Sequence, residues 1–179
     1  MTARKPPRPG HSELDVRALD IRFLNSSPVA DVAAAIGPLF EGAPGFLARL
    51  AGARPYADWE ALFEVARAIA HGMPEAEQIE LLAAHPRLGA PAGTLSAASF
   101  REQGLGRAGA AELERLNDAY EARFGFRYCV NVAGRSRAAL LPEMAAALEA
   151  DRGSELHRAL DAVVDIAMAR LAAARARAG

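Results

Sequence analysis

SELHRALDAVVDIAMARLAAAR, residues 154–175, carries the strongest fold signal in the chain. Its apolar residues recur every three or four positions, which is the spacing of one buried helix face. They are Leu156, Leu160, Val163, Val164, Ile166, Ala167 and Leu171. Ser154 is the expected N-cap, after a turn at Asp151-Arg152-Gly153, and a helix is predicted over about 155–175.

The rest of the chain carries the same kind of start and stop signals. Residues that cap or open helices, and the glycines and prolines that end them, divide it into helical segments. The first segment begins with Ser27 as N-cap and Pro28 at the first helical position. Together with the segment above, helices are predicted at about 28–36, 44–50, 58–72, 74–85, 96–103, 108–124, 136–150 and 155–175.

Residues 126–132 (FRYCVNV) are the one segment with strand-like content. A lone extended strip among helices cannot make a sheet, so its main-chain groups need other partners, and a ligand is one candidate. The predicted fold class is therefore all-α: a single-domain bundle of roughly eight helices over residues 13–179, with one short extended segment near 126–132. Residues 1–12, basic and rich in proline, are predicted to be a disordered arm.

The amino-acid composition argues against several classes of protein function. Hydrophobic residues make up 51% and charged residues 24%, which is typical of a soluble globular protein. The net charge of −1 argues against general attraction to nucleic acid or anionic membranes. The single cysteine, Cys129, excludes an internal disulfide and a cysteine cluster for zinc, and it fits a reducing cytosol. The termini show neither a secretory nor a peroxisomal signal, and the arginine-rich composition indicates a bacterial source.

Two short polar motifs supply candidate chemistry. In the first, AHPRLG at 84–89, Pro86 disfavours a helical conformation for His85, so the histidine is expected at a helix end. There the helix dipole favours the imidazolium form, which suits proton transfer. A solvent-facing histidine without a function is an equally good interpretation of the spacing alone.

The second motif, SFREQG at 99–104, places Ser99, Glu102 and Gln103 on one helix face. A carboxylate flanked by a hydroxyl and an amide can bind a small ligand rich in N–H and C=O groups. From spacing alone, an ordinary solvated face is the better interpretation. Elsewhere, Cys129 is expected to pack, and Arg170 either reaches a carboxylate or is a surface arginine near a helix end.

Taken in order along the chain, these pieces resemble the 2-oxo-4-hydroxy-4-carboxy-5-ureidoimidazoline (OHCU) decarboxylases of urate degradation. The resemblance runs from about Leu24 to Leu171. It rests on Phe40-Glu41-Gly42-Ala43-Pro44, Arg54-Pro55-Tyr56, Ala84-His85-Pro86, Ser99-x-x-Glu102-Gln103, the stretch from Leu116 to Gly125, Ile166-Ala167 and Arg170-Leu171.

The resemblance implies an all-α fold, no cofactor, often a homodimer, and cofactor-independent conversion of OHCU to (S)-allantoin. His85 would be the acid–base residue and Glu102 would orient the ureido-imidazoline. The substrate would be lined by Pro86, Ser99, Phe100, Arg101, Gln103, the main chain of Tyr128, Cys129, Val130, Asn131 and Val132, and Arg170. Metal, pyridoxal and thiamine are not required, and the sequence shows no motif for them.

Two positions depart from the family's pattern. Arg127 stands where members often have proline, and Asn131 stands where a small or apolar residue is expected. The alternative to an enzyme is a non-catalytic helical module for small-ligand binding or interaction on the same fold. A helical DNA-binding regulator is a weaker alternative, because the chain has no basic recognition helix.

Overall fold

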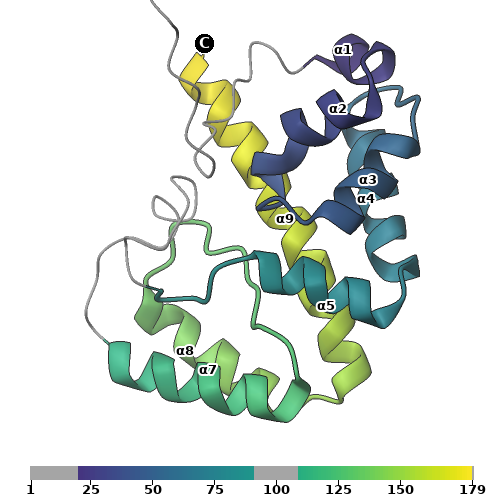
Figure 1. Ribbon diagram of the computed structural model, residues 1–179. Helices are drawn as coiled ribbons and strands as arrows, with labels where there is room; N and C mark the ends of the chain where they lie inside the picture. The colour runs from purple at the N-terminus through teal and green to yellow at the C-terminus, as the bar shows by residue number, and fades with distance from the viewer. Residues whose placement is uncertain (1–19, 91–108, 179) are drawn as a thin grey trace, which may run out of the picture.

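The computed structural model of the protein describes residues 20–90 and 109–178 (Figure 1). Within these ranges the chain is all-helical and contains no strand, so the predicted fold class is confirmed. The elements are α1 (Ile21–Ser26), α2 (Val29–Ile36), the 3-10 turn η1 (Gly37–Leu39), α3 (Pro44–Gly52), α4 (Trp59–Gly72), α5 (Glu75–Ala84), α7 (Ala110–Phe124), α8 (Arg137–Ala147) and α9 (Arg152–Ala178). The arm expected at 1–12 and the helix expected at 96–103 lie outside the described residues.

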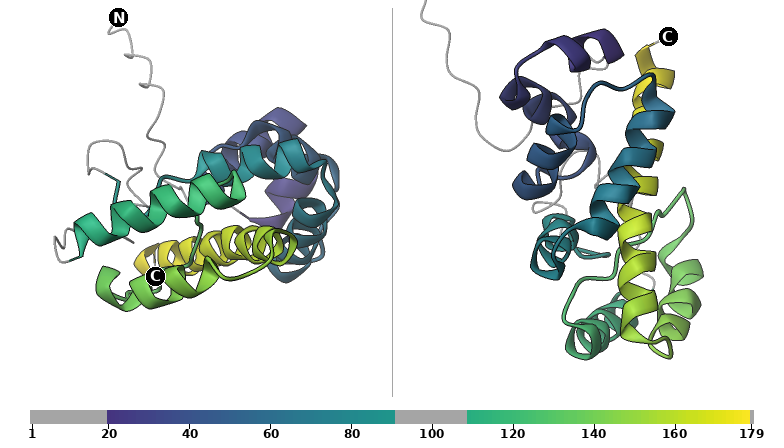
Figure 2. Two further views of the ribbon diagram at one scale, coloured as in Figure 1. Left: turned by 90° about the horizontal axis from the view of Figure 1, so that it is seen from below. Right: turned by 90° about the vertical axis from the view of Figure 1, so that its right-hand side faces the viewer.

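The longest described helix, α9, is the axis of the molecule. It packs against α4, α5 and η1. Figures 1 and 2 show α1, α2 and α3 toward the C-terminal end of α9, while α7 and α8 pair at its other end. Helix α5 crosses between these two groups, so its C-terminus faces the middle of the fold. The helices therefore bring segments from both halves of the sequence around α9.

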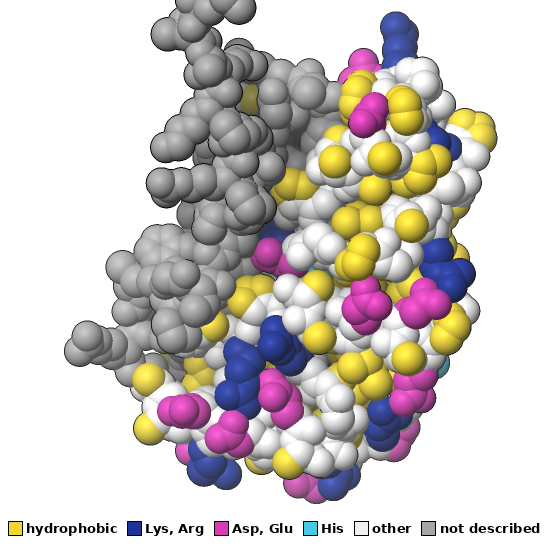
Figure 3. Space-filling view, viewed as in Figure 1, with side chains coloured by type: hydrophobic (Ala, Val, Ile, Leu, Met, Phe, Trp, Pro, Cys, Tyr) yellow, Lys and Arg dark blue, Asp and Glu magenta, His cyan; other side chains and the backbone are white. Residues whose placement is uncertain are grey.

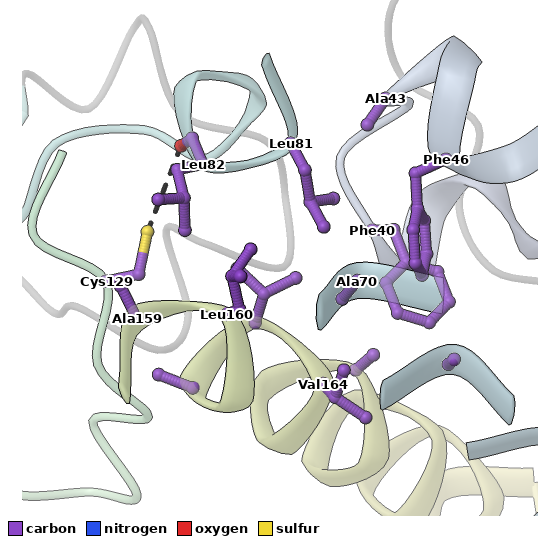
Figure 4. Packing of buried hydrophobic residues seen from close by; sticks show 14 of the residues in the cluster. Phe40, Ala43, Phe46, Ala70, Leu81, Leu82, Cys129, Ala159, Leu160 and Val164 are labelled. Carbon is purple, nitrogen blue, oxygen red and sulfur yellow. Dashed lines mark hydrogen bonds between the residues drawn. The ribbon is translucent and has the colours of Figure 1, made fainter. Parts of the chain in front are cut away.

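The buried face of α9 matches the periodicity read from the sequence. All seven of its predicted inward residues are buried. Figure 4 shows Leu160 of α9 pointing toward Leu81 and Leu82 of α5, and all three side chains are fully inaccessible to solvent. Burying a leucine side chain stabilises a fold by roughly 1.5–3 kcal/mol, so this face contributes much of the free energy that holds α9 to its neighbours.

Of the N-caps predicted for α2 and α4, one is confirmed and the other is wrong. Asp58 caps α4, because its Oδ1 accepts a hydrogen bond from Ala61 N at 2.9 Å. The expectation for Ser27 was wrong: α2 begins at Val29, and Pro28 is the N-cap without a side-chain bond. Ser27 instead ends α1, with its N–H bonded to Phe23 O at 3.0 Å.

The start of α9 also differs from the expectation. Asp151-Arg152-Gly153 was expected to be a turn before an N-cap at Ser154, but α9 begins at Arg152. Asp151 acts as the cap, since its Oδ1 accepts from Ser154 N at 2.9 Å and its main-chain oxygen accepts from Glu155 N at 3.0 Å. An aspartate caps as well as a serine and stands three residues earlier, so the helix extends to it. Helix α8 in turn stops at Ala147, short of the expected residue 150.

The described surface mixes charges of both signs. Figure 3 shows Lys or Arg side chains beside Asp or Glu side chains across the lower part of one face. Among the helices that the structure describes, none is long and apolar enough to cross a bilayer.

Candidate functional site around His85

His85 terminates α5, as the following proline predicts. It is the C-cap, with ψ 138° and its N–H bonded to Leu82 O at 3.2 Å. The expected alternative of a solvent-facing histidine is wrong, because only 3% of the residue is exposed. The carbonyl of Leu81 lies 3.2 Å from Nδ1 and can only accept, so Nδ1 carries the ring proton.

The other ring nitrogen of His85 marks the site. Nε2 is buried, and no hydrogen-bond partner for it exists in the described structure. Buried polar atoms in folded proteins are nearly always paired, so an unpaired one makes its residue a candidate for a functional position. With the proton on Nδ1, Nε2 presents a lone pair that can accept a hydrogen bond or a proton from a ligand.

The helix dipole was expected to favour the imidazolium form of His85, but other effects in the fold outweigh it. Burial, followed by the positive charge of Arg170, lowers the pKa of His85 to about 4. The Leu81 carbonyl and the Glu41 carboxylate act in the opposite direction, and Arg127 lowers the pKa further. Desolvation of a charge outweighs a helix dipole worth about 0.3–1 kcal/mol, so His85 is neutral at pH 7.

Acid pH is expected to weaken the fold through His85. The unfolded chain protonates near the usual pKa of 6.5 and the folded chain near 4, so the unfolded state binds more protons between these values. The free energy of unfolding should therefore fall as pH falls, by about 2 kcal/mol between pH 7 and about pH 4.5 from this group alone. Urea titrations of the wild type and of His85→Gln across this range measure it. A constant stability difference between the two proteins would contradict the lowered pKa.

Arg170 is part of the interior and is no surface arginine. Its side chain is 5% exposed, and Nη2 lies 2.7 Å from Glu41 Oε1. Nη1 donates to the carbonyls of Leu39 at 3.2 Å and Pro38 at 3.4 Å. These bonds hold the guanidinium of Arg170 in a fixed position, from which its positive charge acts on His85.

Glu41 is the site residue that the sequence did not reveal as one. It holds Arg170 while its own backbone adopts φ 55°, in the left-handed region that non-glycine residues rarely occupy. Such conformations persist where the surrounding structure imposes them, and they gather at functional sites. A positive φ at a glutamate leaves no pattern in the sequence, so only the folded chain shows it.

The extended segment at 126–132 lies beside the end of α5. Cys129 Sγ lies 3.9 Å from Leu82 O (Figure 4), and Arg127 Nη1 donates to His85 O at 2.6 Å. Cys129 packs as expected, and burial raises the pKa of its thiol to about 12. Across the described residues, no hydrogen bond from the main-chain N–H groups of 128–132 is found. Among the described residues these N–H groups therefore lack the intramolecular partners that a sheet would supply, and the predicted ligand contact stays a prediction.

A polar cluster around the buried carboxylate of Glu155 fixes this segment to α7 and α9. Arg158 donates from Nη1 to Cys129 O at 3.0 Å, and its guanidinium lies 4.7 Å from the Tyr128 ring centroid. Glu155, 3% exposed, accepts from Arg158 Nε at 2.8 Å and from Tyr120 Oη at 2.6 Å. The carboxylate thus holds the arginine, and the arginine holds the segment.

The loop after His85 is fastened to α7. Arg87 pairs with Glu121 at 2.8 Å, and Asn117 Nδ2 donates to Leu88 O at 2.9 Å. Gly89 turns the chain with φ 84°, and a Cβ there would lie 2.6 Å from Leu113 Cδ2. Only glycine satisfies both the positive φ and this close approach.

Gly89→Ala is therefore expected to lower the free energy of unfolding by about 2 kcal/mol or more, because left-handed strain and overpacking add. Gly134→Ala is the matched control: its φ is 76°, but no atom lies within 4 Å of the added Cβ. Chemical denaturation of both variants separates the clash from the strain. Equal losses in the two variants would show that the Leu113 contact contributes nothing.

The structure brings together part of the predicted residue set. His85, Arg170 and the segment with Tyr128, Cys129 and Val132 are buried, whereas Pro86, Val130 and Asn131 are half-buried. Ser99, Phe100, Arg101, Glu102 and Gln103 lie outside the described residues.

Within the described residues the fold is all-helical, and it encloses a buried histidine whose Nε2 has no hydrogen-bond partner. The OHCU decarboxylase family model matches residues 25–172, and the chain belongs to this family. It is 30% identical over 162 residues to the OHCU decarboxylase of Mus musculus, covering 86% of this chain and 91% of that protein. It is 32% identical over 159 residues to the uric acid degradation bifunctional protein PucL of Bacillus subtilis, covering 86% of this chain and 31% of PucL. The chain thus spans about a third of PucL.

The fold agrees with a solved relative. A crystal structure of an OHCU decarboxylase in the presence of (S)-allantoin matches with a TM-score of 0.62, covering 76% of this chain and 93% of that one. At 23% identity, this likeness concerns the fold alone.

Proposed function

We propose that this chain converts OHCU to (S)-allantoin without a cofactor, with His85 as the acid–base residue. Membership of the family supports the reaction class. The observation that carries the proposal is the unpaired Nε2 of His85, a buried base kept neutral next to Arg170. A neutral imidazole is the form needed to accept a proton from a substrate hydroxyl.

The substrate's own chemistry needs only such a base. OHCU carries a carboxylate and a hydroxyl on a ring carbon next to a C=N bond. When the bond to the carboxylate breaks, CO2 leaves and the electron pair moves into that C=N. Protonation of the resulting enol-like intermediate at the ureido-bearing carbon, on one face, gives (S)-allantoin. The protein's contribution is to hold the ring and to manage two protons.

We assign these tasks to individual residues of the chain. His85 Nε2 accepts the hydroxyl proton, and the main-chain N–H groups of 128–132 bind ring or ureido oxygens. Arg170, held by Glu41, contributes a positive charge that favours an anionic substrate. We assign orientation of the ureido group to Glu102, and lining of the site to Pro86, Ser99, Phe100, Arg101 and Gln103.

OHCU turnover tests the proposal directly. Freshly generated OHCU also decays on its own, so its loss is followed by NMR with and without the protein. We expect acceleration that grows in proportion to protein concentration. Loss at the uncatalysed rate, with saturable line broadening of the ligand signals, would favour the non-catalytic binding module instead.

We extend the proposal to a homodimer in a bacterial cytosol, which rests on the family resemblance and on the composition. Sedimentation velocity at micromolar concentration tests the assembly. A single species of about twice the chain mass of 18.9 kDa is expected, and a monomer would reject it.

A further inference from the structure

We propose that Arg127 is a positioning residue that holds His85 and the 126–132 segment in register with each other. Its Nη1 donates to His85 O at 2.6 Å and to Ala83 O at 2.8 Å. The residue is on the segment proposed to bind the substrate, and its hydrogen bonds end on the residue proposed to move the proton. The catalytic part of this inference rests on the proposed function.

The end of α5 needs such a donor. The last carbonyls of a helix have no partner within the helix, and Pro86 has no N–H to offer. Arg127 supplies charged N–H groups to two of these carbonyls, and such bonds are about twice as strong as neutral ones. These bonds fix the main chain of His85, and so they fix the point from which the imidazole side chain extends.

The segment is held on both sides of Tyr128. On one side, the Arg127 side chain donates to the end of α5. On the other, Arg158 of α9 donates from Nη1 to Cys129 O at 3.0 Å. The two anchors act on residues 127 and 129, so they set the position of the intervening main chain relative to His85. Loss of the first anchor leaves the long contact from Cys129 Sγ to Leu82 O, at 3.9 Å, as the described side-chain hydrogen bond from the segment to α5.

Among the residues that the structure describes, three charged groups act on His85 from different elements. Arg170 comes from α9, Glu41 from the chain after η1, and Arg127 from the extended segment. The contribution of Arg127 is the smallest of the three and lowers the pKa of His85. Its removal is therefore expected to raise that pKa slightly, while the main effect is on geometry.

Arg127→Gln tests the inference, with Arg123→Gln as the matched control. Arg123 is an exposed arginine on α7 that also donates to a main-chain oxygen, Ala150 O, at 3.3 Å. Ring signals of His85, assigned by comparison with His85→Gln, are followed by NMR without substrate. We expect shifted ring signals and a higher pKa in Arg127→Gln, and wild-type values in Arg123→Gln.

Kinetics supply the second readout. In Arg127→Gln we expect kcat to fall about tenfold and KM to rise by a smaller factor, because the proton-transfer group is misplaced while Arg158 still holds the segment at Cys129 O. His85 signals and kcat equal to those of Arg123→Gln would overturn the inference. Arg127→Met retains the aliphatic stem and carries the same test if the Gln variant does not fold. Absence of turnover in the wild type would reject the proposed function, whereas the NMR comparison would still judge the positioning role.

Discussion

His85→Gln is expected to slow enzymatic conversion of OHCU to (S)-allantoin by at least about a hundredfold, the lower range for losing a general acid–base group. Glutamine is similar in length, and its amide N–H can still donate to Leu81 O, so the end of α5 should keep its shape. It has no basic nitrogen with a lone pair to accept the substrate's proton, as Nε2 of the neutral imidazole has. Product formation, corrected for spontaneous decay, measures the loss.

His157→Gln is the control for this result. His157 lies exposed on α9, with its ring 5.0 Å from that of His71, and it is not among the proposed site residues. Wild-type kcat/KM is expected for it. If His85→Gln also turned over at the wild-type rate and gave (S)-allantoin, His85 would not be the acid–base residue.

Arg170→Ala is expected to destabilise the fold by about 3 kcal/mol or more, the range for breaking a buried ion pair. The truncation removes the arginine that lies 2.7 Å from the Glu41 carboxylate, whose side chain is 12% exposed. It also leaves the carbonyls of Pro38 and Leu39 without this donor. Urea denaturation gives the change in the free energy of unfolding.

Two comparisons make this prediction specific. Arg115→Ala breaks an ion pair at 2.6 Å whose arginine is 63% exposed, so its effect on the free energy of unfolding should be small. The double variant Arg170→Met with Glu41→Gln removes both charges and should regain part of the loss. A loss from Arg170→Ala as small as that from Arg115→Ala would show that the pair contributes little to the fold.

The parts of the fold that depend on local signals could be predicted from the sequence. The spacing of Leu156, Leu160 and Val164 predicts the buried face of α9, and Asp58 predicts the start of α4. Helix α1 was missed because its six residues are too few to show a period and only Leu24 is buried. Ser27 was misassigned because the end of one helix and the start of the next compete for the same residue.

The position of His85 at a helix end was predictable from the sequence, but its electrostatics were not. Pro86 predicts that His85 ends a helix, yet its neutral state depends on burial and on Arg170, which lies 85 positions further along the chain. The partnership of Arg170 with Glu41 joins residues 129 positions apart. No spacing rule links such residues, because packing of the N-terminal helices on α9 brings them together. Arg127, which the sequence marks as a departure from the family, forms hydrogen bonds that only the fold reveals.

The most direct test of the central claim is circular dichroism of freshly generated OHCU with and without the protein. Spontaneous decay gives racemic allantoin and no signal, whereas enzymatic protonation on one face gives a signal. The account predicts rapid appearance of the (S)-allantoin signal in proportion to protein added. Racemic product at the uncatalysed rate would contradict it.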